Sequence, residues 1–229
     1  MALPKRLFRY ARAALDRLRG GAGRVPIGYF RQFLSDGPVI VEAGSHNGID
    51  TANLARCWPR GRIFGFEPVP ILRAQVERQI QGLKNATCFP FALGQQPGQA
   101  ELYVSSGQSD GSSSLLRPTG HLQEHPDVSF DETIVVPVVT LDDWARSEAL
   151  EAIDFLWLDL QGGELAALKG APRLLPTVRV VYSEVLLKPM YDGAPLYPEF
   201  RSWMEAAGFR VAREEISSAD AGNVVFVRT

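Results

Sequence analysis

The sequence predicts a single α/β domain built on a doubly wound, mostly parallel seven-stranded sheet. Three observations predict this fold: strand-like apolar runs alternate with helical patterns, a glycine turn follows the first run, and the chain ends in two strand-like runs joined by a polar turn. With 229 residues the chain can bury one sizeable core but leaves too little for a second domain of ordinary size. We therefore expect residues 25–229 to form one domain.

Each element of that fold has its own signal. Five short apolar runs fit buried parallel strands, which we expect at residues 39–43, 62–67, 86–91, 153–159 and 178–184. Three intervening segments have helical periodicity, and we expect these helices at residues 49–58, 70–82 and 164–175. The last two runs, 209–216 and 223–228, flank a polar turn, so one closing strand should enter antiparallel. A closing hairpin differs from the six parallel strands of the nicotinamide-binding fold.

Residues 94–150 form an insertion between the third and fourth core strands. Its ends contain strand-like runs at residues 100–105 and 133–139, whereas residues 107–131 are rich in Ser, Gly, Pro and His. Long irregular loops in compact domains tend to be functional. We therefore expect this insertion to form a lid over a ligand.

Residues 1–24 are strongly basic, although the whole chain has a net charge of −2. Leucine and alanine recur there at helical spacing, which predicts a basic amphipathic N-terminal helix. The helix either packs its leucines on the domain, which we favour, or makes a peripheral contact with an anionic membrane face.

Composition narrows the class of protein further. The net charge gives no support for nucleic acid as a partner, and no apolar run approaches the roughly 18 residues of a membrane-spanning helix. The two cysteines lie far apart without metal-ligand spacing, so a reduced, cytoplasmic protein without a bound metal fits them best. The oligomeric state has no signal in the sequence.

A glycine-rich turn follows the first strand, and Glu42 lies near the end of that strand. The turn consists of Gly44, Ser45, His46, Asn47 and Gly48, and a helix opens behind it with Asp50 and Thr51 available as caps. Glycine allows a sharp turn and a close approach to a ligand. Free N–H groups at the helix N-terminus suit a carboxylate, and Glu42 beneath the turn suits an amino group.

The second strand ends in Phe66, Glu67 and Pro68. Glu67 lies 19 residues after Gly48, close to the ~20-residue offset at which an acidic residue binds ribose hydroxyls. Both signals fall at the carboxyl ends of adjacent strands, where open α/β sheets bind ligands. The pair predicts a site for a nucleoside that carries an amino acid group.

Motifs in a fixed order carry a family resemblance over about residues 37–228. They occupy residues 39–51, 65–68, 91–94, 112–115, 139–142, 153–164, 168–171 and 223–226. In this order they resemble the FkbM family of class I methyltransferases, whose fold is Rossmann-like. The resemblance implies S-adenosylmethionine as methyl donor and, as acceptor, a hydroxyl on a sugar, glycan or related small metabolite.

The resemblance also implies a wider set of site residues. It adds Phe91, Ala92, Asp159 and Gln161 to the expected cofactor site. In the insertion, we expect Ser113, Ser114 and His121 to bind the acceptor. The chain departs from the usual pattern at two positions, with His46 where Asn is common and Gln161 where Glu is usual, so one expected negative charge is missing.

Methyl transfer from a sulfonium is a direct displacement, so the protein mainly has to align the reacting atoms in a dry pocket. A base near the acceptor hydroxyl should help by roughly 10²–10⁴-fold. Our candidates for this base are Asp159, Glu184 and His46, in that order. For Asp159, helix capping or cofactor contact alone is an equal alternative.

Rival functions have weaker support. Residues 107–111 match the nucleophile elbow of serine esterases, yet no histidine follows the fourth strand. His121 and His125 match a zinc-peptidase pattern, but Pro126 follows at once. A nicotinamide-dependent reductase would need a Tyr-x-x-x-Lys pair, which the sequence lacks. A fourth alternative is a non-catalytic module that keeps the fold, because a fold can persist after its activity is lost.

Overall fold

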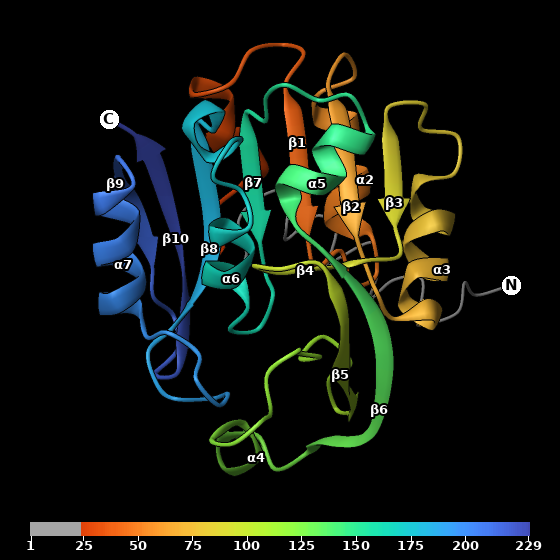
Figure 1. The fold of residues 1–229 in the computed structure, drawn as a ribbon, viewed down its shortest axis with the longest axis vertical. Coiled ribbons are helices and arrows are strands. Elements are labelled where there is room, and N and C mark those ends of the chain that lie inside the picture. The colour runs from red at the N-terminus through yellow and green to blue at the C-terminus, as the bar shows by residue number, and fades with distance from the viewer. Residues whose placement is uncertain (1–23) are drawn as a thin grey trace, which may run out of the picture.

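The computed structural model describes residues 24–229, so the helix expected over residues 1–24 lies outside the described residues except for Arg24. The main sheet has seven strands in the order β3-β2-β1-β7-β8-β10-β9 (Figure 1). Its strands are β1 (Val39–Ala43), β2 (Arg62–Phe66), β3 (Ala86–Phe89), β7 (Phe155–Leu158), β8 (Val180–Leu186), β9 (Phe209–Glu215) and β10 (Ala221–Arg228). The final strand, β10, runs antiparallel to both of its neighbours, while the pairs from β3 to β8 are parallel. The predicted doubly wound fold is confirmed.

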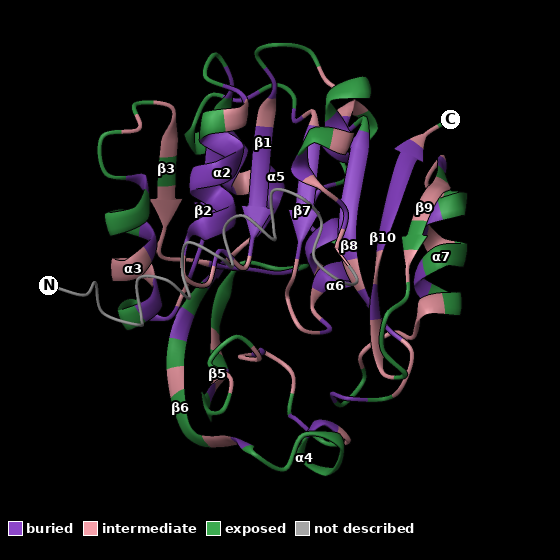
Figure 2. Cartoon of the chain, turned by 180° about the vertical axis from the view of Figure 1, so that it is seen from behind, coloured by how far each residue is buried: buried purple, intermediate pink, exposed green. Residues whose placement is uncertain are grey.

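Helices cover both faces of this sheet (Figures 1 and 2). One face carries η1 (Ile27–Gln32), α2 (Ile49–Cys57) and α3 (Pro70–Ile80), and the other carries α5 (Leu141–Ser147), α6 (Glu164–Lys169) and α7 (Tyr197–Ala206). Two short elements complete the list, α4 (His121–Glu124) and η2 (Leu175–Thr177). Figure 2 shows that the buried residues concentrate in the central strands and in the helix surfaces that face them.

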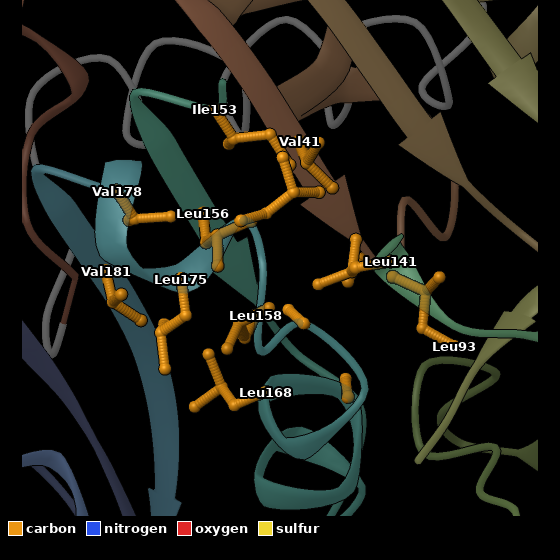
Figure 3. Packing of buried hydrophobic residues seen from close by; sticks show 14 of the residues in the cluster. Val41, Leu93, Leu141, Ile153, Leu156, Leu158, Leu168, Leu175, Val178 and Val181 are labelled. Atoms are coloured by element: carbon orange, nitrogen blue, oxygen red, sulfur yellow. The ribbon is translucent and has the colours of Figure 1, made fainter. Parts of the chain in front are cut away.

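Two apolar cores hold the layers together. On the α6 face, Val41, Leu156 and Val181 come from three adjacent strands and are fully buried in one cluster with Leu168 of α6 (Figure 3). On the other face, Phe30 of η1 packs on Phe155 with ring centroids 4.6 Å apart. Each fully buried aliphatic or aromatic side chain contributes about 1.5–3 kcal/mol, so these clusters fix the sheet that carries the site.

The insertion forms a second, three-stranded sheet in the order β4-β6-β5. Its strands are β4 (Ala92–Leu93), β5 (Gly98–Gly107) and β6 (Val128–Val139). Figure 1 shows that β5, β6 and α4 extend beyond the carboxyl ends of the parallel strands. The last part of the predicted insertion behaves differently, because Leu141 and Trp144 of α5 are buried in the main core.

The structure corrects several predicted boundaries. The helix expected over residues 164–175 ends at Lys169, because Pro172 disfavours the helical conformation of the residue before it. Strand β3 ends at Phe89 instead of residue 91, since Pro90 has no amide hydrogen to continue the ladder. Helices α5 and α7 were not predicted. A capping pattern marks α5, since the Thr140 side chain accepts a hydrogen bond from the Asp143 amide.

Within residues 24–229, no helix is both long enough and apolar enough to cross a membrane.

We predict that Gly44→Ala destabilises the protein by about 2–4 kcal/mol. Gly44 has φ +86°, and a Cβ there would lie 2.0 Å from the carbonyl oxygen of Asp159. Urea unfolding measures the loss. Gly28→Ala is the matched control, because a Cβ at Gly28 meets no atom within 4 Å. Equal stabilities for the two variants would show that the turn does not need glycine.

Candidate functional site

A cavity of about 500 Å³ opens at the carboxyl ends of β1, β2 and β7. Glu42 of β1, Glu67 after β2 and Asp159 after β7 line its inner side, and residues of the insertion line the outer side. Its volume is typical of sites for small molecules and cofactors. Its position at the carboxyl ends of the strands is the place where open α/β sheets bind their ligands.

The turn after β1 is held against β2 by its backbone. The amides of Gly44 and Ser45 both donate to the carbonyl of Phe66, at 3.1 and 2.9 Å. Gly48 has φ +77°, and a Cβ there would lie 2.5 Å from the Cα atom of Val76 on α3. Gly44 and Gly48 both allow close packing of the chain on itself. Gly44 also lines the cavity, as we expected of a residue near a ligand, whereas Gly48 does not line it.

Glu42 lies beneath this turn and is almost fully buried, with 2% of its surface exposed. Its carboxylate accepts hydrogen bonds from the hydroxyls of Ser45 and Thr51. Thr51 belongs to α2, so Glu42 joins the strand, the turn and the helix. These contacts hold one carboxylate oxygen while the residue lines the cavity.

Glu67 ties the second strand to the same turn. One oxygen accepts a hydrogen bond from the His46 amide at 2.8 Å and the other from the Val69 amide at 2.9 Å. Burial raises the pKa of Glu67 to about 7, although these two hydrogen bonds lower it. Glu67 and the glycine turn therefore face one cavity and are in direct contact.

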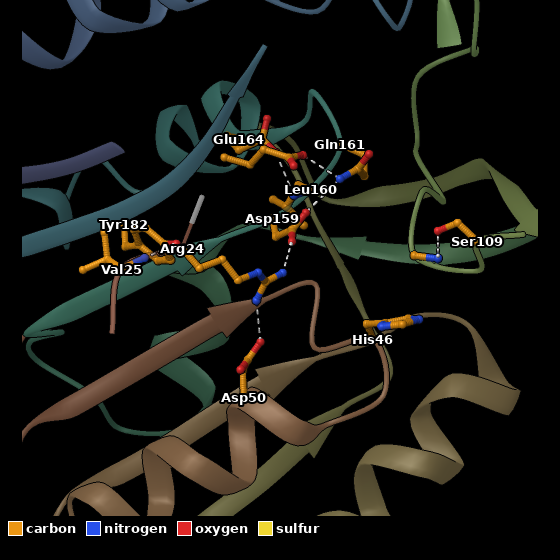
Figure 4. Close-up of polar contacts among 12 residues, drawn as sticks. Arg24, Val25, His46, Asp50, Ser109, Asp159, Leu160, Gln161, Glu164 and Tyr182 are labelled. Carbon is orange, nitrogen blue, oxygen red and sulfur yellow. Dashed lines mark hydrogen bonds and ion pairs between the residues drawn. The ribbon is translucent and has the colours of Figure 1, made fainter. Parts of the chain in front are cut away.

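The turn after β7 brings together three polar side chains (Figure 4). The Gln161 amide nitrogen donates to Asp159 at 2.8 Å and to Glu184 of β8 at 2.6 Å. The other atom of that amide, Oε1, accepts from the Tyr191 hydroxyl at 2.8 Å. Gln161 has φ +52°, so a strained backbone presents this amide to both carboxylates.

Two acids near this turn, the buried Glu164 and the half-buried Glu184, have raised pKa values. The Glu164 carboxylate accepts hydrogen bonds from the Leu160 and Gly162 amides and so fixes the turn. Burial raises the pKa of Glu164 to about 7. Burial also raises the pKa of Glu184 well above its ordinary value, and the charges of Asp159 and Glu164 raise it further.

The insertion closes the outer side of the cavity. Ser113 and Ser114 line it, but both hydroxyls are engaged in the fold, with the Ser105 amide and with the Gln161 carbonyl respectively. His121 is 4% exposed, lines the cavity, and its buried Nδ1 has no hydrogen-bond partner among the described residues. His46 crosses from the glycine turn to the insertion, where its Nε2 lies 2.7 Å from Asp110.

Arg24 also lines the cavity, and the sequence analysis missed it. The amide of the next residue, Val25, donates to the hydroxyl of buried Tyr182, which places Arg24 at the site (Figure 4). Its Nη1 donates to Asp50 of α2 at 2.9 Å, and its Nη2 lies 3.9 Å from Asp159. No local motif marks this arginine, because its partners lie 26 and 135 residues away in the chain.

The remaining predicted residues divide into two groups. Asn47, Asp50, Pro68, Phe91 and Ala92 line the cavity. Gly48 and Thr51 do not line it and instead support the turn from below. The Asn47 side chain accepts a hydrogen bond from the Ile49 amide, which starts α2.

Comparison with known proteins gives one decisive result. Residues 42–211 match the model of the methyltransferase FkbM domain, a range that includes the three strand ends of the cavity. The chain belongs to the FkbM methyltransferase family. It is therefore a methyltransferase with S-adenosylmethionine as its cofactor, as the resemblance implied.

Individual relatives agree with the FkbM assignment. The chain is 32% identical over 161 residues to the 2-O-methyltransferase NoeI of Sinorhizobium fredii, a match that covers 68% of this chain and 66% of NoeI. The match thus spans slightly less than two thirds of that relative.

Solved structures share the fold. Fibrillarin from Aeropyrum pernix, solved with natively bound S-adenosyl-L-methionine, has a TM-score of 0.51 at 14% identity and covers 95% of this chain and 74% of its own. The N-terminal domain of EvdMO1, solved in the presence of SAH and D-fucose, has a TM-score of 0.50 at 15% identity and covers 94% of this chain and 82% of its own.

The rival motifs do not assemble in this FkbM chain. Ser109 follows the end of β5, without the strand-to-helix turn of a nucleophile elbow, and its hydroxyl accepts from the Gly111 amide. His125 pairs with Asp220 at 2.7 Å. Among residues 24–229, no group of three or more His, Cys, Asp and Glu side chains is arranged to hold a metal ion.

We predict that Glu164→Gln flattens the pH dependence of stability. The raised pKa of Glu164 means that its stabilising contribution is present below about pH 4.5 and is lost as pH rises through about 7. Glutamine keeps the oxygen that accepts both amides but cannot ionise. Between pH 5 and 8, the variant should gain on the order of 2–3 kcal/mol relative to the parent.

Urea unfolding at four pH values in that range measures this difference. Glu101→Gln, which changes an exposed glutamate on β5, is the control and should run parallel to the parent protein. Parallel curves for Glu164→Gln and the parent would show that Glu164 does not titrate in this range.

Proposed function

We propose that this protein transfers a methyl group from S-adenosylmethionine to a hydroxyl of a sugar, a glycan or a related small metabolite. The observation that carries the proposal is the cavity in which carboxylates from the ends of β1, β2 and β7 face one another. Family membership supports the same reaction class. NoeI, named as a 2-O-methyltransferase, supports oxygen as the acceptor atom.

The residues present fit the cofactor by the chemistry of their polar groups. An amino group and ribose hydroxyls are hydrogen-bond donors, and Glu42 and Glu67 supply acceptors on the two sides of the glycine turn. Glu42 would hold the amino group and Glu67 the ribose hydroxyls. Phe91 and Ala92 would face the adenine from the start of the insertion. When bound, the cofactor supplies a methyl group on a sulfonium that leaves as a neutral thioether.

The acceptor would enter between the turn after β7 and the insertion. Residues 109–114, His121 and Tyr191 line this part of the cavity. The unpartnered Nδ1 of His121 offers a hydrogen bond to a hydroxylated ligand, because a buried ring nitrogen without a partner is costly. Backbone hydrogen bonds from Thr119 and His121 to the Met190 carbonyl close this side as a lid.

Asp159 is the better of the two carboxylates to accept the acceptor's proton. Desolvation and the charges of Asp159 and Glu164 raise the pKa of Glu184, which favours its protonated form, and a protonated carboxyl group cannot take up another proton. Asp159 is half-exposed to the cavity, and Gln161 holds one of its oxygens. His46 is paired with Asp110 at the rim, which assigns it to closing the cavity.

We predict that the purified protein binds S-adenosylmethionine and S-adenosylhomocysteine, whereas NAD gives no heat in calorimetry. Incubation with S-adenosylmethionine and a panel of mono- and oligosaccharides should add a single methyl group, detected by mass spectrometry. A binding signal with NAD and none with S-adenosylmethionine or S-adenosylhomocysteine would refute the proposal. Cofactor binding without transfer to any hydroxyl would instead favour the non-catalytic module.

We predict that Asp159→Asn lowers turnover by about 10²–10⁴-fold. Affinity for S-adenosylhomocysteine should change less than about threefold, because asparagine keeps an oxygen that accepts from Gln161. Glu184→Gln is the matched variant on the other side of Gln161 and should lose less turnover. The reverse order of the two losses would assign the base to Glu184.

A further inference from the structure

The charges that line the cavity are unbalanced. Six of the acidic side chains that line it come from the main domain, namely Glu42, Asp50, Glu67, Asp159, Glu184 and Asp220. Among the described residues that line it, Arg24 is the only lysine or arginine. Such a cavity attracts an ammonium or a sulfonium, but it repels a carboxylate unless a cation is placed beside it.

Arg24 is held at the place where that cation is needed. Its backbone is fixed by the hydrogen bond from the Val25 amide to the Tyr182 hydroxyl at 3.3 Å. Its side chain then extends from behind β7 towards the first turn of α2, between Asp159 and Asp50 (Figure 4). One third of the side chain, 32%, is exposed. The guanidinium is thus anchored and open to the cavity at once.

The two contacts of the guanidinium are unequal. Nη1 makes a hydrogen bond of 2.9 Å with Asp50, whereas Nη2 lies 3.9 Å from Asp159, which is too long for a hydrogen bond. Arg24 therefore uses Asp50 as its anchor, makes only a long contact with Asp159, and lines the cavity.

We propose that Arg24 binds the carboxylate of the methionine part of S-adenosylmethionine. A guanidinium presents paired N–H donors in a plane and binds carboxylates through two parallel hydrogen bonds. Asn47 and Asp50, which flank the start of α2, line the same cavity, and the N-terminus of a helix favours a negative group. Recognition of the donor then depends on a residue that precedes the main domain. This proposal rests on the proposed function, because it needs S-adenosylmethionine as the ligand.

A purely structural role for Arg24 makes a different prediction. If the arginine only bridges Asp50 and Asp159, its removal perturbs the cavity for every ligand alike. If it binds the carboxylate, its removal matters only for ligands that have one. S-adenosylmethionine and its decarboxylated analogue differ in this group alone, so the pair separates the two roles.

The test is calorimetry of both ligands with the full chain and with Arg24→Gln. We expect the variant to bind S-adenosylmethionine on the order of 10- to 100-fold more weakly, and its affinity for the decarboxylated analogue to change less than about threefold. Arg24→Lys keeps the charge without the planar donors and should give an intermediate loss. Arg31→Gln is the control, because Arg31 lies in η1, is exposed and does not line the cavity.

Each other result overturns the assignment. An equal loss of affinity for both ligands would show that Arg24 only bridges Asp50 and Asp159. Unchanged affinity for both ligands would show that Arg24 does not take part in binding. Circular dichroism and thermal unfolding check that the variants are folded. If the parent protein binds neither ligand, the proposed function fails. If the parent and the Arg24→Gln variant both bind the two ligands equally well, only the role of Arg24 fails.

Discussion

The site depends on the close contact between the glycine turn and the end of β7. Gly44 approaches the Asp159 carbonyl so closely that no side chain fits between them. The Asp159 amide also donates to the carbonyl of Ala43 at 3.0 Å. Because β1 and β7 end at the same level, the carboxylates of Glu42 and Asp159 line one cavity. Glu67 joins them through the His46 amide.

Much of this arrangement follows from local sequence. Alternating apolar runs predict the parallel strands, and the carboxyl ends of adjacent parallel strands must lie together. The offset between Gly48 and Glu67 therefore predicts that the glycine turn and this carboxylate lie at one ligand site. The antiparallel entry of β10 was equally visible, because a polar turn of a few residues can only join antiparallel neighbours.

The parts that the sequence did not predict depend on contacts between distant residues. A side chain at position 170 is excluded because Gly170 packs against Gly94, which lies 76 positions before it. Arg24 reaches the cavity because Val25 is held by Tyr182, far along the chain. The basic composition of residues 1–24 made every arginine there look like a solvated or membrane-facing charge. Periodicity describes faces of elements, and it contains no information about such pairings.

The amide of Gln161 shows what a departure from the family pattern changes. Glutamate at this position would place a third carboxyl group beside Asp159 and Glu184, whereas the amide of Gln161 donates a hydrogen bond to each of them. The hydroxyl of Tyr191 donates to the amide oxygen of Gln161. Only one of the two amide orientations therefore directs the nitrogen to the carboxyl groups and the oxygen to Tyr191. Residue 161 therefore decides whether two carboxyl groups are joined by a neutral amide, as in this chain, or lie beside a third carboxyl group, as they would with glutamate at this position.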